Sequence, residues 1–221
     1  TQVLTLFPYT TLFRSAKGNV ALPGTVLTLD ARATPEKVHA TFAAKIGDAA
    51  GALALVDGSA RYTGSGSVRG EGTYEIASRR FRASTDAALV GVRRGGEGSS
   101  SLNVKAEISG TPDAPHVDGH VTAQGVRAGG IDVAAVAVSV KGGLTGAEVR
   151  AEITPREAIA PVSASAWIVL RNGAFVVENG EIRGIGEGPL AVAVHSESGS
   201  TALDATAPSI DLARLASVLG L

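Results

Sequence analysis

The chain has 221 residues, with 20 basic and 21 acidic side chains, a formal net charge of −1 and no cysteine. This charge balance argues against a nucleic-acid-binding protein that works through bulk electrostatics. The missing cysteines exclude a disulfide framework and a cysteine-based metal site. Apolar residues make up 44% of the chain but aromatic residues only 4%, which favours a long sheet with a shallow apolar face over a compact globule.

The first fifteen residues differ from the rest of the chain. Residues 5–15 read TLFPYTTLFRS, which resembles the translation of a short-read sequencing adapter. We therefore expect residues 1–15 to be non-native and leave them out of the fold prediction. The less favoured alternative is an amphipathic strand built on apolar residues such as Leu6 and Phe13. Methionine is also absent, so we expect a fragment of a longer protein.

Short strands are predicted along the first half of the chain. The spacing of apolar residues predicts strands at 24–33, 37–46 and 49–56, and Asp57-Gly58 is a hairpin signal after the third. A Gly- and Ser-rich segment at 61–71 precedes two more strands, at 73–77 and 79–85, with a turn around Arg79. Residues 93–101 carry Gly, Ser and charge without periodicity, so they predict a loop and a candidate subdivision of the chain.

Residues 102–141 carry the clearest pattern in the sequence. Apolar and polar side chains alternate with a period of two along 102–109 and again along 117–124. Turn residues around Pro112-Asp113, and then at 127–130, separate these two strands from each other and from a third at 131–140. The segment therefore predicts an antiparallel meander with one apolar and one wet face. The candidate residues for a functional apolar surface are Leu102, Val104, Ile108, Val117 and Val121.

The second half continues as strands and ends in a helix. Strands are predicted at 148–154, 163–170, 174–178, 181–186, 190–196 and 201–207. Residues 155–161 are predicted to be a loop or a single helical turn. Trp167 and Phe175 flank the hairpin signal Asn172-Gly173 and are interpreted as core anchors. Leu212, Leu215, Val218 and Leu219 fall at helical spacing, with Ser209 or Asp211 as the N-cap and Gly220 as the stop.

Together these elements predict an all-β fold. About a dozen strands form an elongated, twisted, mostly antiparallel β-sheet curled into an open groove, with a short C-terminal helix. Residues 16–221 are treated as one such segment. Nothing in the sequence predicts a layer of helices over the apolar face, so the sheet either closes as a sandwich or stays open.

Two segments carry a family resemblance. Residues 110–119 read GTPDAPHVDG before an alternating strand, and residues 209–220 read SIDLARLASVLG. Both resemble recurring phrases of the TamB and AsmA-like bacterial envelope proteins, the family of the translocation and assembly module. The resemblance implies a periplasmic segment whose parent is held in the inner membrane by an N-terminal anchor missing from this chain. It also implies a role in bringing lipids or outer-membrane proteins to the outer membrane, with an outer-membrane β-barrel protein as a partner.

The sequence carries no signature of catalysis. It contains no G-x-S-x-G elbow, no P-loop and no H-E-x-x-H motif. His116, Asp118 and His120 alternate along one strand, so they share a face and could hold zinc. We favour a solvated face, because Val117 and Val121 already supply the buried side of that strand. We therefore expect a protein that is not an enzyme and has no cofactor and no metal.

An apolar stripe of this kind predicts a lipid ligand. An exposed apolar face far larger than a few hundred Å² usually has a ligand, and each CH₂ removed from water contributes about 0.8 kcal/mol. Phospholipid acyl chains are therefore the expected partners of the groove. The first rival is a structural or adhesive surface protein, like an autotransporter passenger, which would need regular short coils. The second is a β-helical carbohydrate enzyme, which would need convergent carboxylates.

Overall fold

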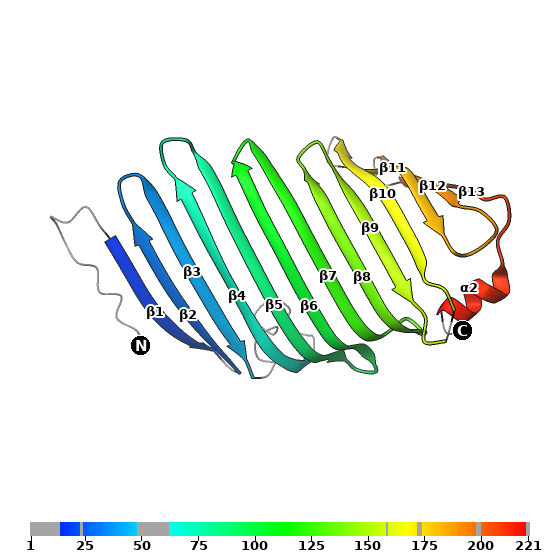
Figure 1. Cartoon of the computed structure of the whole chain (residues 1–221), viewed down its shortest axis with the longest axis horizontal. Helices are drawn as coiled ribbons and strands as arrows, with labels where there is room; N and C mark the ends of the chain where they lie inside the picture. The colour runs from blue at the N-terminus through cyan, green and yellow to red at the C-terminus, as the bar shows by residue number, and fades with distance from the viewer. Residues whose placement is uncertain are drawn as a thin grey trace. The chain divides into compact units, whose positions relative to one another are not determined.

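The computed structural model describes residues 14–22, 24–47, 62–157, 159–171, 174–197 and 200–219. Within these residues, thirteen β-strands follow one another in chain order in one antiparallel sheet, and one short α-helix follows the last strand (Figure 1). The sheet is open, because its edge strands β1 (Arg14–Leu22) and β13 (Ser200–Thr206) do not pair with each other. The predicted all-β, mostly antiparallel fold with a C-terminal helix is therefore confirmed.

The chain forms two compact units, Thr1–Pro115 (unit 1) and His116–Leu221 (unit 2), which are described separately. Unit 1 is an antiparallel meander in which each strand pairs with the next along the chain. Its strands are β1 (Arg14–Leu22), β2 (Thr25–Ala33), β3 (Lys37–Ile46), β4 (Tyr62–Glu75), β5 (Arg80–Arg94) and β6 (Glu97–Thr111).

The loop predicted at residues 93–101 is wrong. Arg94 ends β5, Glu97 begins β6, and these two residues pair across a two-residue turn. Gly95 has a φ of 64°, a conformation that glycine adopts without a steric penalty, so a tight hairpin fits where we expected an irregular segment. The Gly- and Ser-rich segment at 61–71 was not expected to be a strand either, yet most of it belongs to β4.

The first strand, β1, was not predicted at all. Its sequence, RSAKGNVAL, lacks the clean alternation that marks a half-buried strand. The strand nevertheless pairs along its whole length with β2, and Arg14 and Ser15, which we assigned to the non-native segment, pair with Ala33 and Arg32. Residues 1–13 and the strand predicted at 49–56 lie outside the described residues.

Unit 2 continues the meander and ends in the helix. Its strands are β7 (Ala114–Ala128), β8 (Ile131–Gly143), β9 (Gly146–Thr154), β10 (Val162–Arg171), β11 (Ala174–Arg183), β12 (Leu190–Glu197) and β13 (Ser200–Thr206), and its helix is α2 (Leu212–Leu219). Residues 174–178 and 181–186 were predicted as two strands, but they form the single strand β11 as far as Arg183. A register shift between Val177 and Gly180, with Asn179 at a φ of 51°, makes a bulge where we expected a break.

The small buried core lies where α2 meets the sheet in unit 2. Val218 on α2, Val162 on β10 and Ile185 after β11 are all buried and form one hydrophobic cluster. Asp211 caps the helix, because its Oδ1 accepts a hydrogen bond of 2.9 Å from the backbone N–H of Arg214. Of the two N-caps that the sequence allowed, the structure therefore uses Asp211. The predicted helical spacing of Leu212, Leu215 and Val218 is also confirmed.

Candidate functional site

One face of unit 1 is apolar from β2 to β6. The strand register places Leu102 opposite Leu89, and Val104 opposite Ala87. Because side chains alternate across a strand, the same register carries this face across the neighbouring strands. We call it the unit 1 apolar face, and its apolar and aromatic members are Leu27, Leu29, Ala31, Ala33, Val38, Ala40, Phe42, Ala44, Ile46, Val68, Tyr74, Phe81, Ala83, Ala87, Leu89, Leu102, Val104, Ala106 and Ile108. The register places no charged residue on this face at residues 25–33, 38–46, 66–74, 81–89 and 102–110.

The unit 1 apolar face has no cover in the described part of the chain. Leu29 is 44% exposed, Phe42 is 37% exposed and Ile108 is 40% exposed. All the buried apolar residues in the described structure lie at position 133 or later, which leaves none in unit 1. A sheet that packed this face against a second layer would bury such side chains. The face is therefore open on the described part of unit 1.

Glycines on β4 make room for larger neighbours on this face. A Cβ on Gly70 would lie 2.5 Å from Phe42 Cε1, and one on Gly66 would lie 2.8 Å from Leu89 Cδ2. The Phe42 ring and the Leu89 side chain thus lie over bare backbone. These two side chains cover the backbone polar groups of β4 with hydrocarbon. They occupy space that a larger residue than glycine would fill.

The opposite face of unit 1 carries its charges in pairs across neighbouring strands. Lys17 Nζ lies 2.9 Å from Asp30 Oδ2, and Arg82 Nε lies 2.9 Å from Glu107 Oε1. The hydrogen bond from Lys17 lowers the pKa of Asp30, and the hydrogen bond to Glu107 raises the pKa of Arg82. These are exposed pairs and contribute little to stability each. Unit 1 therefore has one apolar face and one face that carries charged pairs.

Unit 2 has an apolar face of its own. Val121 lies opposite Val138, and Val117 lies opposite Gly142, so both predicted residues lie on this face. A hollow of about 170 Å³ opens on it, lined mostly by small apolar side chains of β9 to β12. Helix α2 covers one end of this face, where Val218 clusters with Val162 and Ile185, and Ile153, Ile182, Leu190 and Leu215 pack against this cluster.

The helix that covers this end is held at several points. Ser217 Oγ donates a hydrogen bond of 2.6 Å to Glu157 Oε2 in the loop that follows β9. The backbone N–H of Asp211 donates one of 2.8 Å to the carbonyl of Ile185. The segment at 155–161, for which a loop or a helical turn was predicted, is a loop in its described residues. It links the helix to the sheet.

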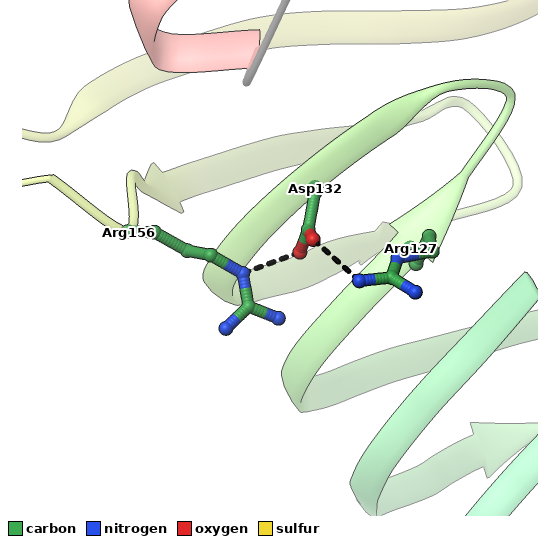
Figure 2. A network of polar contacts seen from close by, with 3 residues as sticks. All are labelled: Arg127, Asp132 and Arg156. Carbon is green, nitrogen blue, oxygen red and sulfur yellow. Dashed lines mark hydrogen bonds and ion pairs between the residues drawn. The ribbon is translucent and has the colours of Figure 1, made fainter.

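The same loop also holds the end of the β7–β8 hairpin. Figure 2 shows Asp132 between two arginines: Arg127 Nη2 lies 2.8 Å from Asp132 Oδ2, and Arg156 in the loop pairs with Asp132 Oδ1. Hydrogen bonds from Arg127 and then from Arg156 lower the pKa of Asp132, and the bond to Asp132 raises the pKa of Arg127. No sequence signal marked this cluster, because Arg156 is distant in the chain.

The residues weighed as a zinc site lie on the wet face. His116, Asp118 and His120 are all exposed, whereas Val117 and Val121, on the other face of the same strand, are half-buried. Asp118 Oδ2 lies 3.8 Å from Lys141 Nζ on β8. Within the described residues, no group of three or more His, Cys, Asp or Glu side chains could hold a metal ion.

The prediction that Trp167 is a core anchor is wrong. Trp167 is 39% exposed and lies opposite Glu148 on β9, so it belongs to the charged face of unit 2. Its parity with Ser163 and Ser165 along β10 could have shown this, because alternate residues share a face. The side chain of Phe175, the other predicted anchor, lies outside the description.

Comparison with known proteins gave no relatives: no family model, no curated protein and no solved structure matches the chain. In the described residues, no helix is long and apolar enough to cross a membrane.

Proposed function

We propose that this chain is a non-enzymatic segment of a TamB/AsmA-like envelope protein that carries lipid acyl chains on its apolar faces. In this proposal the parent protein is anchored in the inner membrane and spans the periplasm. Phospholipid acyl chains are the ligands, and an outer-membrane β-barrel protein is a partner. The resemblance of residues 110–119 and 209–220 to that family supports the cellular setting.

The observation that carries the proposal is the exposure of large apolar side chains on a face without charges. Phe42 and Ile108 keep 37% and 40% of their surface accessible on the unit 1 apolar face. Exposed apolar areas of this kind are costly in water and are typically contact surfaces. The charges on the opposite face keep that side in water.

An acyl chain fits such a face for physical reasons. Removing a 16-carbon chain from water contributes roughly 10 kcal/mol, and the Ala, Val and Gly positions between the larger Leu, Ile and Phe side chains place few steric demands on the chain. The Phe42 and Leu89 side chains lie over glycines, so the surface has few obstacles to a chain that moves along it. Such a surface suits many lipids without selecting one.

The test introduces a charge on each apolar face. Val104→Asp in unit 1 and Val121→Asp in unit 2 should leave the fold intact, because a carboxylate on an open face stays hydrated. Both variants should lose photo-crosslinking to phospholipid labelled in its acyl chains. Thermal melting reports the fold and gel analysis of the labelled lipid reports the binding.

Matched controls lie on the same strands, facing the other way. Asn103→Asp and His120→Asp introduce the same carboxylate on the exposed polar faces, where both residues already lie in water. Crosslinking should survive in both controls. A collapse of the fold in Val104→Asp, or no crosslinking to the unchanged protein, would refute the lipid proposal. The structural or adhesive role would then be favoured.

A further inference from the structure

Two arginines that are distant in the chain meet at one carboxylate in unit 2. Arg127 on β7 and Arg156 in the loop after β9 bind different oxygens of Asp132, and we call these three residues the Asp132 cluster. The side chains of Arg127 and Arg156 are 62% and 52% exposed, whereas that of Asp132 is only 28% exposed. The aspartate is thus a covered counter-ion that holds two exposed guanidinium groups in place.

The two guanidinium groups keep most of their hydrogen-bond donors. Arg127 binds Asp132 through Nη2 and Arg156 binds it through Nε, so each arginine uses one nitrogen. Figure 2 shows both terminal nitrogens of Arg156 turned away from Asp132, one of them on the side of Arg127. In the described part of the chain, neither arginine pairs with another carboxylate. A guanidinium has five N–H groups, so the cluster has donors left for a second acceptor.

The charge of the Asp132 cluster favours an anion as that acceptor. Two guanidinium groups face one carboxylate, which leaves one positive charge in excess. Glu157, which follows Arg156 in the loop, accepts a hydrogen bond from Ser217 on α2, so its carboxylate is directed to the helix. The planar N–H fork of arginine matches the oxygens of a phosphate group, which it binds by charge-assisted hydrogen bonds. The cluster therefore has the chemistry of a phosphate site.

Apolar side chains follow the cluster along β8. Val136 and Val138 come after Asp132 at even spacing, so the three side chains lie on one side of the strand. Val136 is about 13 Å from Asp132 along the strand, because each residue of a strand adds about 3.3 Å. Val138 lies opposite Val121 on the apolar face of unit 2. A molecule with a phosphate group and an acyl chain would meet both kinds of surface on this strand.

We propose that the Asp132 cluster binds a phosphate group, and that this group belongs to a phospholipid whose acyl chain lies along β8. The phosphate site stands on the cluster alone, whereas its assignment to a lipid rests on the proposed function. The bound headgroup fixes the position and the direction of the lipid on unit 2. The apolar face by itself offers no such fixed point.

Three compounds that share one skeleton separate the two contributions. Dodecanoylglycerol phosphate has a phosphate group and an acyl chain, glycerol phosphate lacks the chain, and dodecanoylglycerol lacks the phosphate. Each compound is titrated into the full chain below its critical micelle concentration, and calorimetry measures the affinity. The compound with both groups should bind at least about tenfold more tightly than either of the others.

Arg127→Gln and Arg156→Gln each remove one guanidinium and leave the other to pair with Asp132. Each variant should bind dodecanoylglycerol phosphate at least about fivefold more weakly and dodecanoylglycerol as tightly as before. The control is Arg183→Gln, which removes an arginine paired with Glu181 on the charged face of unit 2. Its affinity for all three compounds should be unchanged. Melting curves establish that the variants are folded.

The phosphate site and the lipid function fail in different ways. The phosphate site is overturned if neither phosphate compound binds, or if both arginine variants bind dodecanoylglycerol phosphate as tightly as the unchanged protein does. Binding of dodecanoylglycerol in that case leaves the lipid function intact. If glycerol phosphate binds as tightly as the acylated compound and needs both arginines, the phosphate site stands and the lipid assignment is wrong.

Discussion

The ring of Phe42 on β3 lies over the backbone of Gly70 on β4. A Cβ on Gly70 would come within 2.5 Å of Phe42 Cε1 and 2.6 Å of the carbonyl oxygen of Ser84, distances at which atoms must move apart. Aromatic side chains that cover glycines in this way compensate for the missing side-chain packing of glycine in a strand. The pair therefore allows a glycine-rich strand within the unit 1 apolar face.

This relationship predicts that Gly70→Ala destabilises unit 1. The new methyl group must displace either the Phe42 ring or the β5 backbone, and overpacking of this kind costs about 1–3 kcal/mol. The matched control is Gly72→Ala on the same strand, where the nearest atom to the new Cβ is 3.7 Å away. That control should be neutral or slightly stabilising, because alanine lowers the entropy of the unfolded chain. Urea unfolding measures both, and equal effects would contradict the packing.

The Asp132 cluster predicts a loss of stability in acid. Because Arg127 and Arg156 lower the pKa of Asp132 in the folded protein, the unfolded chain binds the proton more tightly. The contribution of Asp132 to the free energy of unfolding is therefore complete above its unfolded pKa of about 4. It is lost as the pH falls through the lower pKa that Asp132 has in the folded protein. Asp132→Asn should melt at a lower temperature than the unchanged protein at pH 7, and the difference should shrink below pH 4.

A suitable control for this pH profile is Asp113→Asn. Asp113 lies 3.6 Å from Arg79, and its side chain is 79% exposed. An exposed ion pair of this kind contributes little to the free energy of unfolding. The melting temperature of Asp113→Asn at pH 7 should therefore hardly differ from that of the unchanged protein. If the difference in melting temperature between Asp132→Asn and the unchanged protein were constant from pH 7 to pH 3, the electrostatic account of the cluster would be wrong.

The packing of α2 predicts a strong effect at Val218. This residue is 1% exposed against Val162 and Ile185, so Val218→Asp buries a carboxylate without a partner. We expect a loss of several kcal/mol in the free energy of unfolding, measured in urea. Ala213→Asp places the same group on the exposed side of the helix and should cost less than about 1 kcal/mol. Similar losses in both variants would mean that α2 does not pack as described.

The strands that alternate cleanly could be predicted from the sequence. Residues 102–109 and 117–124 lie in β6 and β7, and the predicted turn around Pro112-Asp113 separates these strands. In these segments the register and the side-chain pattern agree. The strand β1 was not predicted because Lys17, Gly18 and Asn19 interrupt any apolar periodicity. Its position in the sheet is set by pairing with β2.

The remaining errors have local causes. The bulge at Asn179 was interpreted as a break between two strands. The sequence does not show that β11 stays paired with β10 and β12 on both sides of this bulge. Trp167 was interpreted as a core anchor because it is an aromatic residue that flanks a hairpin signal, although its parity with Ser163 and Ser165 placed it on the wet face. Both the apolar face and an open sheet were predicted, and the described part of unit 1 has the open face and not the closed sandwich that the sequence also allowed.

The central claim, that the unit 1 apolar face contacts acyl chains, is tested most directly by photo-crosslinking from single positions. A photoreactive phenylalanine analogue is placed at Ile108, which is 40% exposed on that face, or at Lys105, which is exposed on the opposite face of the same strand. Both proteins are incubated with vesicles of phospholipid radiolabelled in the acyl chains and then irradiated. We predict labelling from position 108 and none from position 105. Equal labelling from both positions, or none from position 108, would contradict the account.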